Sequence, residues 1–192
     1  MSIGRPGQLL RMRRRHKSRT RWSAVWLLGI AAIAAMPSAP CRGQASPAAQ
    51  IAIAVADFDY TDTSGEVQNQ VAAHDAQLRA FVGAFRSALG ADTRYQLVKL
   101  ECHEPPCTAG RLAAGGELIE RARAAGAQLL LYGGIHKMST LISNAKVQVI
   151  DVAADKLLFD RLVSFRGDGA EAWERAQRFL VRDLTSANLG AP

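Results

Sequence analysis

The sequence predicts an α/β (α+β) protein, with a single mixed sheet of about five strands and amphipathic helices packed on it. Two observations support this fold class. The stretch 127–166 contains long apolar and alternating runs that are typical of three successive β-strands. Three other segments repeat apolar residues every three or four positions, as helices that cover a sheet do. The expected order of elements is β-α-β-α-β-β-β-α.

The first strand is expected over residues 51–58, a short apolar run, and a cluster of turn-forming residues, 59–65, ends it. Acidic side chains gather at this strand end, where ligands commonly bind in parallel and mixed sheets. Ordinary turn chemistry is the favoured interpretation of this cluster, because no His or Lys is evidently paired with the carboxylates. The candidate binding residues are Asp59, Asp62, Ser64 and Glu66.

The first helix is predicted over residues 66–89, because its apolar residues form one stripe. Gly90 is expected to end this helix as a left-handed cap. His74 lies near the edge of the stripe, which indicates a residue at the boundary of the core and not a ligand. A short strand, 95–100, and a helix interrupted by glycine, 108–125, are expected next.

The three strands within 127–166 differ in pattern. Residues 127–132 are nearly all apolar, as in a central strand, and the two glycines that follow permit a bulge or the close approach of another backbone. Residues 143–152 alternate between apolar and polar side chains, so one side of this strand is expected to meet water. A tight hairpin leads from there to an antiparallel strand, 157–165. Three further candidate binding residues lie on the polar side of the alternating strand: Asn144, Lys146 and Gln148.

The last helix is predicted to start at Asp168, which forms with Glu171 the arrangement of a capping box. Apolar residues from Trp173 to Leu184 then recur at helical spacing. This helix is expected to close a single domain that spans residues 46–190.

The positive charge of the chain comes from its amino-terminal leader. The chain has 24 Lys and Arg against 17 Asp and Glu, but nine of the basic residues and none of the acidic residues precede Ser46. From Ser46 onward, 15 basic residues stand against 17 acidic ones, a formal charge of −2. The basic composition therefore gives no reason to expect nucleic acid as a partner.

Residues 1–45 have the form of a secretory signal peptide followed by a linker. A basic segment, 11–21, precedes the apolar run 24–35, and small residues suited to cleavage follow. Cleavage is expected after Ala45, with Ala39 as the second choice. The apolar run is shorter than the roughly 20 residues that a membrane span needs, so the protein is expected in the periplasm. The alternative is a single uncleaved anchor in the inner membrane.

Export would place Cys102 and Cys107 in an oxidising compartment, where thiols tend to pair. A disulfide between them would clip one short loop. The alternative is a metal site formed by Cys102, His103 and Cys107, or a thiol-redox site. The spacing fits neither the usual zinc patterns nor a thioredoxin-like motif, so the disulfide is favoured.

Four motifs of the domain, taken together, indicate a family. They are IAIAVADFDYTDTSGE at the start of the domain, the hairpin D-V-A-x-x-K, the bend S-F-R-G-D, and the helix E-x-W-x-x-A-x-R-F-L-V-R. This set resembles the DUF2380/DUF3280 group of exported bacterial proteins of unknown function. The group tends to have Thr-Gly where this chain has Ala154-Asp155, so Asp155 is expected to adopt a positive φ.

The resemblance implies a fold similar to the amino-terminal domain of TolB, and to the curli-secretion and penicillin-binding-protein-activator lipoproteins. Those are small α/β modules that bind partners in the cell envelope. Similarity of fold alone does not transfer a function.

Motifs of catalytic sites are missing from the sequence. It has no G-x-S-x-G elbow, no P-loop, no H-E-x-x-H, and no G-x-G-x-x-G after a strand. We therefore expect a non-enzymatic binding or accessory module of the cell envelope, with a protein partner and no cofactor. A metal-handling or thiol-redox protein, and a signal-anchored membrane protein with the same domain, are the alternatives. No particular oligomeric state is predicted.

Overall fold

The computed structural model describes residues 49–67, 70–112 and 116–190. The predicted signal peptide and linker, 1–45, and the alternative membrane anchor lie outside the described residues. Among the residues that are described, no helix has the length and the apolar character that a membrane crossing requires.

Six strands and three helices make up the described fold, in the order β-β-α-β-α-β-β-β-α. The strands are β1 (Ile51–Val55), β2 (Asp59–Asp62), β3 (Tyr95–Val98), β4 (Leu129–Lys137), β5 (Ile142–Asp151) and β6 (Lys156–Arg166). The helices are α1 (Val71–Ala91), α2 (Gly116–Ala124) and α3 (Ala170–Ser186). The predicted class, a single mixed sheet with helices packed on it, is confirmed.

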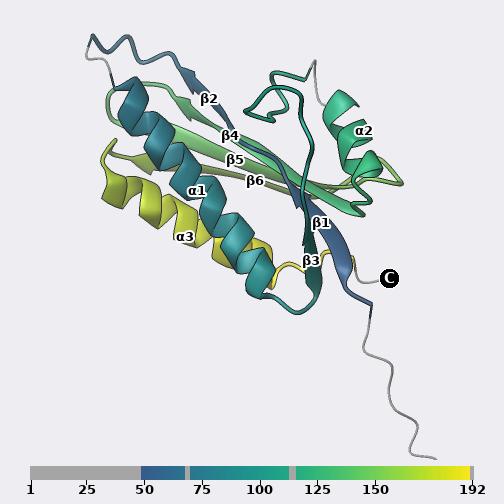
Figure 1. The fold of residues 1–192 in the computed structure, drawn as a ribbon. Helices are drawn as coiled ribbons and strands as arrows, with labels where there is room; N and C mark the ends of the chain where they lie inside the picture. The colour runs from purple at the N-terminus through teal and green to yellow at the C-terminus, as the bar shows by residue number, and fades with distance from the viewer. Residues whose placement is uncertain (1–48, 68–69, 113–115, 191–192) are drawn as a thin grey trace, which may run out of the picture. The chain divides into compact units, whose positions relative to one another are not determined.

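The central strand of the sheet is β4, as its apolar sequence predicts. The strand order is β3-β1-β4-β5-β6, with β1 parallel to both of its neighbours and β5 antiparallel to both of its own. On one side, β4 pairs with β1 through Leu129–Leu131 and then with β2 through Gly134–Lys137. On its other side, β4 pairs with β5 along its whole length. Figure 1 shows β1 and β2 following one another along the same edge of β4.

The sixth strand corrects the prediction that residues 59–65 form only a turn. The first four of these residues are β2, which runs parallel to the second half of β4. Because β4 extends well beyond the end of β1, its backbone groups there need partners, and the chain after β1 supplies them. The polar composition of residues 59–65 predicted a turn. Residues 59–62 form a strand instead, because the unpaired edge of β4 lies beside them.

The two faces of the sheet are covered unequally (Figure 1). Helices α1 and α3 lie side by side on one face, over a large apolar core that includes Phe58, Phe81, Phe85 and Trp173. The shorter α2 lies on the other face, over a smaller cluster that includes Leu118, Leu130 and Ile150.

Two predicted backbone features are present. A Cβ atom added to Gly133 would lie 2.2 Å from the carbonyl oxygen of Lys146, so β5 does approach β4 closely at this glycine. Asp155 in the β5–β6 hairpin has a φ of 50°, the positive value expected from its comparison with the family pattern.

The ends of the helices differ from the prediction. Helix α1 begins at Val71 instead of residue 66, and Gly90 lies inside its last turn, with Asp92 as the C-cap. Helix α3 has Gly169 as its N-cap and no side-chain cap, so the predicted capping box does not form. Both starts move because Glu66 and Asp168 direct their carboxylates to a buried lysine, Lys137, instead of to a helix end.

The predicted helix over 108–125 is shorter than expected. Its helical part in the structure is α2, which starts at Gly116, while 109–112 form a turn. Residues 113–115, which include the first of the two interrupting glycines, lie outside the described residues.

Candidate functional site

The predicted binding residues of β5 lie together on a face that α2 covers only in part. Helix α2 packs over β1 and the start of β4. Beyond it, Asn144, Lys146 and Gln148 form one row on β5, while the residues between them point into the core. We call this uncovered row, with its neighbours Asp160, Leu162 and Ser164 on β6, the open face.

Hydrogen bonds between β5 and β6 order the polar groups of the open face. The hydroxyl of Ser164 donates to Oδ1 of Asn144 at 2.6 Å, and Nε2 of Gln148 donates to Oδ2 of Asp160 at 3.3 Å. Leu162 lies directly opposite Lys146 and is 59% exposed. The open face therefore combines positioned polar groups with an uncovered apolar side chain.

An apolar pocket of about 290 Å³ lies next to the open face, at the edge of the area that α2 covers. Tyr132 connects the two, because it lines the pocket and pairs with Gln148 across β4 and β5. Burial raises the pKa of Tyr132, so its phenol stays protonated at neutral pH. The lining residues are Ala109, Gly110, Leu118, Ile119, Leu130, Tyr132 and Ile150.

The candidate residues around β2 separate into different places. Asp59 lies on the same face as the β5 row, and its Oδ2 accepts the N–H of Gly110 at 2.8 Å. Asp62 accepts both the N–H and the hydroxyl of Ser64, at 2.8 and 2.6 Å, and these bonds lower the pKa of Asp62. Glu66 lies elsewhere, on the side of the sheet that α1 and α3 cover, where it binds Lys137.

The loop after β3 contains the predicted disulfide between Cys102 and Cys107, whose Cα atoms are 5.8 Å apart. Since both sulfur atoms are in this bond, the loop offers no thiolate to a metal, and His103 is exposed beside it. Within the described ranges, no group of three or more His, Cys, Asp or Glu side chains is placed to hold a metal ion.

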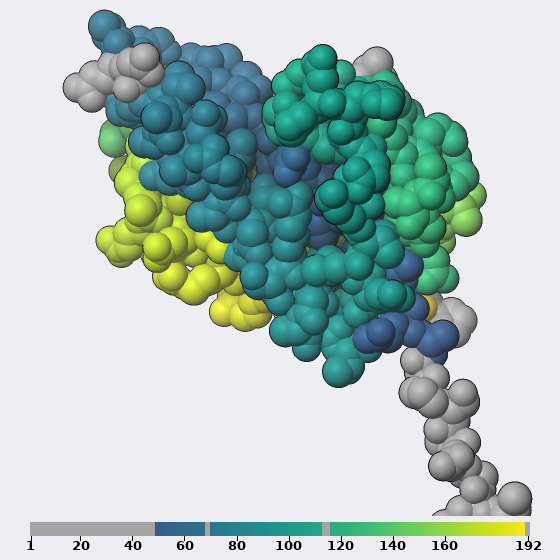
Figure 2. Space-filling model, viewed as in Figure 1, coloured from purple at the N-terminus to yellow at the C-terminus, as the bar shows by residue number. Residues whose placement is uncertain are grey.

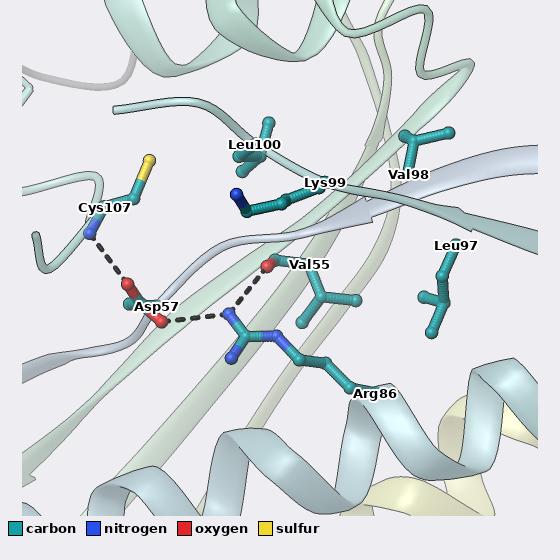
Figure 3. A pocket seen from close by; sticks show the side chains of 8 residues that line it. All are labelled: Val55, Asp57, Arg86, Leu97, Val98, Lys99, Leu100 and Cys107. Carbon is teal, nitrogen blue, oxygen red and sulfur yellow. Dashed lines mark hydrogen bonds and ion pairs between the residues drawn. The ribbon is translucent and has the colours of Figure 1, made fainter. Parts of the chain in front are cut away.

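The same loop is connected to the end of β1 through an aspartate. The backbone N–H of Cys107 donates to Oδ2 of Asp57 at 2.8 Å, and Nη2 of Arg86 donates to Oδ1 at 2.9 Å (Figure 3). The sequence alone gives no indication of this contact, because Asp57 and Arg86 are 29 residues apart.

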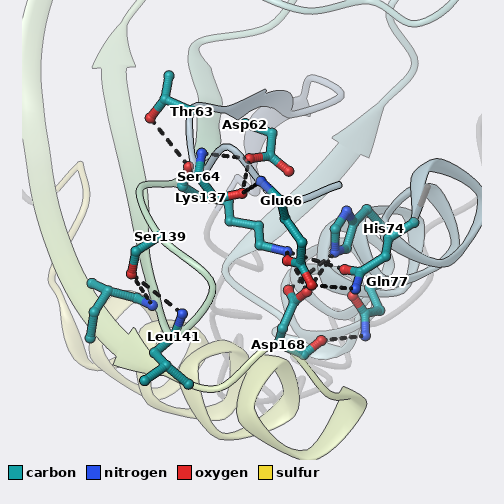
Figure 4. Close-up of polar contacts among 12 residues, drawn as sticks. Asp62, Thr63, Ser64, Glu66, His74, Gln77, Lys137, Ser139, Leu141 and Asp168 are labelled. Carbon is teal, nitrogen blue, oxygen red and sulfur yellow. Dashed lines mark hydrogen bonds and ion pairs between the residues drawn. The ribbon is translucent and has the colours of Figure 1, made fainter. Parts of the chain in front are cut away.

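A buried ionic cluster, which the sequence did not reveal, lies at the far end of β4. Lys137 is 1% exposed, and its ammonium donates to Oε2 of Glu66 and Oδ2 of Asp168, both at 2.6 Å (Figure 4). It also donates to Oε1 of Gln70 at 3.1 Å. A buried charge is tolerated when it is paired and hydrogen-bonded in this way.

His74 extends this cluster into the aromatic core. Its Nε2 lies 3.0 Å from Oδ2 of Asp168, and its Nδ1 lies 2.9 Å from the hydroxyl of Tyr60. The imidazole ring also packs against the rings of Tyr60 and Trp173, with centroids 5.0 and 6.2 Å away. The prediction that His74 lies at the boundary of the core is wrong, because these partners bury it to 4% exposure.

The charges of the cluster stabilise one another. Burial by itself would lower the pKa of Lys137, but hydrogen bonds to Asp168 and Glu66 outweigh it and raise that pKa. Burial would raise the pKa of Asp168, but hydrogen bonds from Lys137 and His74 outweigh it and lower that pKa. Burial raises the pKa of Tyr60 to about 12. At neutral pH the cluster therefore holds the Lys137 cation beside the ionised carboxylate of Asp168.

The cluster connects the end of β4 to the segments that lead into α1 and α3. An ammonium that is 1% exposed is out of reach of a substrate, so we interpret the buried ionic cluster as structural. One signal in the sequence could have found it. Lys137 continues the inward positions of β4 that Leu131 and Ile135 occupy, and an inward lysine requires carboxylate partners.

A family model, described as a protein of unknown function (DUF2380), matches residues 51–184. The chain belongs to the DUF3280 family. The resemblance noted from the motifs is thereby confirmed, and the matched DUF3280 region contains the whole sheet and nearly all of α3. No curated protein matches the chain.

Several solved structures are similar to this DUF3280 chain. The PelC dodecamer from Paraburkholderia phytofirmans is 12% identical, over 74% of this chain and 90% of that one, with a TM-score of 0.48. The carboxy-terminal domain of LpoB from Salmonella enterica is 14% identical, over 62% and 86%, with a TM-score of 0.42. TolB from Acinetobacter baumannii is 16% identical, over 77% of this chain and 30% of that one, with a TM-score of 0.45. Likenesses of this degree carry no argument about function.

Proposed function

We propose that this protein is a non-enzymatic binding module whose open face contacts a protein partner. The observation that carries the proposal is the apolar pocket beside an uncovered row of ordered polar groups. A partner can place an apolar side chain against Tyr132 and Leu162 while it makes polar contacts with Gln148 and Lys146. Interfaces between proteins combine such an apolar anchor with a polar rim.

The proposal includes a place of action, the periplasm, because the leader has the form of a secretory signal. The mass of the purified protein tests this part: we expect an amino terminus at Ser46. A chain that keeps Met1 and stays with the inner membrane would instead favour the anchored alternative.

The contact itself is tested by a photo-crosslinking amino acid placed at Gln148 in cells that express the full chain. We expect one partner protein to be captured from position 148. The matched control is the same amino acid at Arg178, a highly exposed residue of α3 on the opposite side of the sheet. The combined substitutions Lys146→Glu and Leu162→Asp should remove the crosslink at 148 while the protein stays folded.

Two outcomes would overturn the proposal. One is equal capture from positions 148 and 178, since the open face would then have no special role. The other is turnover of generic hydrolase or oxidase substrates by the purified protein at a rate that Asp59→Asn or Asp62→Asn abolishes.

A further inference from the structure

A second pocket lies at the carboxyl ends of β1 and β3. The connection from β1 to β3 runs through α1 on one face, and the connection from β3 to β4 runs through α2 on the other. In open sheets with parallel strands, ligands commonly bind between the carboxyl ends of two neighbouring strands whose following connections cross opposite faces of the sheet. Here β1 pairs directly with β4, and β2 continues along β4 beyond the end of β1, so the chain itself covers that side of the β1 end. The crevice that stays open is therefore the one between the ends of β1 and β3.

This crevice holds a pocket of about 470 Å³. Figure 2 shows the recess between α1 and the segment that follows β3. Its volume falls within the range of about 300–1,000 Å³ that is common for small-molecule sites. The residues that line it are Val55, Asp57, Arg86, Leu97, Val98, Lys99, Leu100 and Cys107.

Two hydrogen bonds position the guanidinium of Arg86 at the pocket, and its other N–H donors are unused by the described residues (Figure 3). Its Nη2 donates to the carbonyl oxygen of Val55 at 3.0 Å and to Oδ1 of Asp57 at 2.9 Å. Within the described part of the chain, Nε and Nη1 have no hydrogen-bond partner. The guanidinium is thus oriented by the protein while three of its N–H groups remain available.

The lining charges leave the pocket positive. The carboxylate of Asp57 is fully engaged, since Oδ1 accepts from Arg86 and Oδ2 accepts from the N–H of Cys107. Among the described residues, the Lys99 ammonium pairs with the exposed Glu101 alone, at 3.0 Å, and a surface ion pair of this kind is weak. Arg86 and Lys99 together with Asp57 give the lining a net charge of +1, which matches a monovalent anion.

The rest of the lining is apolar. Leu97 is 39% exposed although it is a large aliphatic residue, and it lies on the side of β3 that faces α1. Val98 and Leu100 line the pocket from the side of β3 that faces α2. A ligand that combines an anionic head with an apolar chain would cover Leu97 and engage the free donors of Arg86.

We propose that this pocket binds a small amphiphile with a monovalent carboxylate head, held by Arg86 and Lys99, and an apolar chain against Leu97. The site is separate from the open face, because none of the residues of the open face lines this pocket. The disulfide loop contributes to it by holding Asp57, and through Asp57 it holds Arg86.

The test is a titration with decanoate of the protein purified after expression of the full chain, followed by amide resonances. We expect the amides of Lys99, Leu100 and Cys107 to shift. Arg86→Gln should weaken binding by about tenfold or more, because it removes a charged hydrogen-bond donor. Arg178→Gln, which removes an arginine outside the pocket, should leave the affinity unchanged. Decanol, which has the same chain and no charge, should bind at least about tenfold more weakly than decanoate.

Lys99→Gln serves as a second variant in case Arg86→Gln does not fold, because the Lys99 side chain is 84% exposed. We expect it to weaken decanoate binding by about threefold, in keeping with a modest exposed charge. The proposal is overturned if decanol binds as well as decanoate, or if the shifts lie elsewhere in the protein. It is also overturned if folded Arg86→Gln or Lys99→Gln binds decanoate as the unmodified chain does.

Discussion

The two faces of the sheet are formed by the same strands but differ in role, since one is buried in the core and part of the other is exposed to solvent. Because neighbouring residues of a strand point to opposite faces, Val147 lies in the core while Lys146 and Gln148 meet solvent. The difference between the faces comes from their helices: α1 and α3 have 21 and 17 residues, whereas α2 has nine. A short helix leaves part of its face uncovered, and that part is where we place recognition. Substitutions under α1 and α3 should therefore change stability, and substitutions on the open face should change binding.

The largest effect is expected from Phe85→Ala in the apolar core that α1 and α3 cover. Phe85 is fully buried, and its ring lies 5.8 Å from the rings of both Phe58 and Phe81. Removing it leaves a cavity in a packed core, so the free energy of unfolding should fall by about 3–5 kcal/mol. Urea denaturation measures the change. Leu162→Ala on the open face is the matched control, with an expected change within about 0.5 kcal/mol.

A somewhat smaller loss is expected from Lys137→Met in the buried ionic cluster. The substitution leaves two carboxylates without their cation, and breaking a buried pair in this way costs about 3–5 kcal/mol. Glu66 and Asp168 keep side-chain exposures of 21% and 18%, so water can hydrate them and we expect about 2–4 kcal/mol. Adding Glu66→Gln and Asp168→Asn should recover part of the loss. An unchanged stability in Lys137→Met would show that the cluster contributes nothing net, and Lys146→Met controls for the loss of an exposed lysine.

The smallest effect is expected in how the free energy of unfolding depends on pH, to which Asp168 contributes. Its pKa is lower in the folded protein than its ordinary value of 3.8, so the folded state binds this proton less readily than the unfolded state does. The stabilisation is therefore present above about pH 4 and is lost as the pH falls through the folded pKa. Denaturation between pH 5 and pH 2 should show a shallower decline for Asp168→Asn than for the unmodified chain. Equal slopes would contradict the coupling, and Glu120→Gln controls for the loss of a surface acid.

Features of the fold that depend on local pattern could be predicted from the sequence. The apolar run before Gly133 identified the central strand, the alternation around Lys146 identified the half-exposed one, and the departure at Asp155 identified a positive φ. Each of these depends on residues within a few positions of one another. Local periodicity is a strong signal because it follows directly from the geometry of a strand.

The features that could not be predicted join residues that are far apart in the sequence. Lys137 is 71 residues from Glu66 and 31 from Asp168, and His74 is 94 residues from Asp168. Strand β2 was missed for the same reason, since only the unpaired edge of β4 turns a polar turn sequence into a strand. These contacts appear only when the sheet is assembled, and they then override the local preference for caps and turns.

The position of β6 at the rim of the sheet also has a consequence for behaviour in solution. This strand of 11 residues pairs only with β5, so one side of its backbone has no partner strand within the described sheet. Such a rim can recruit a second strand and begin aggregation, and charged side chains are the usual protection. Lys156, Asp160, Arg161 and Arg166 supply that protection here, so the solubility of the protein at high concentration depends on these four residues.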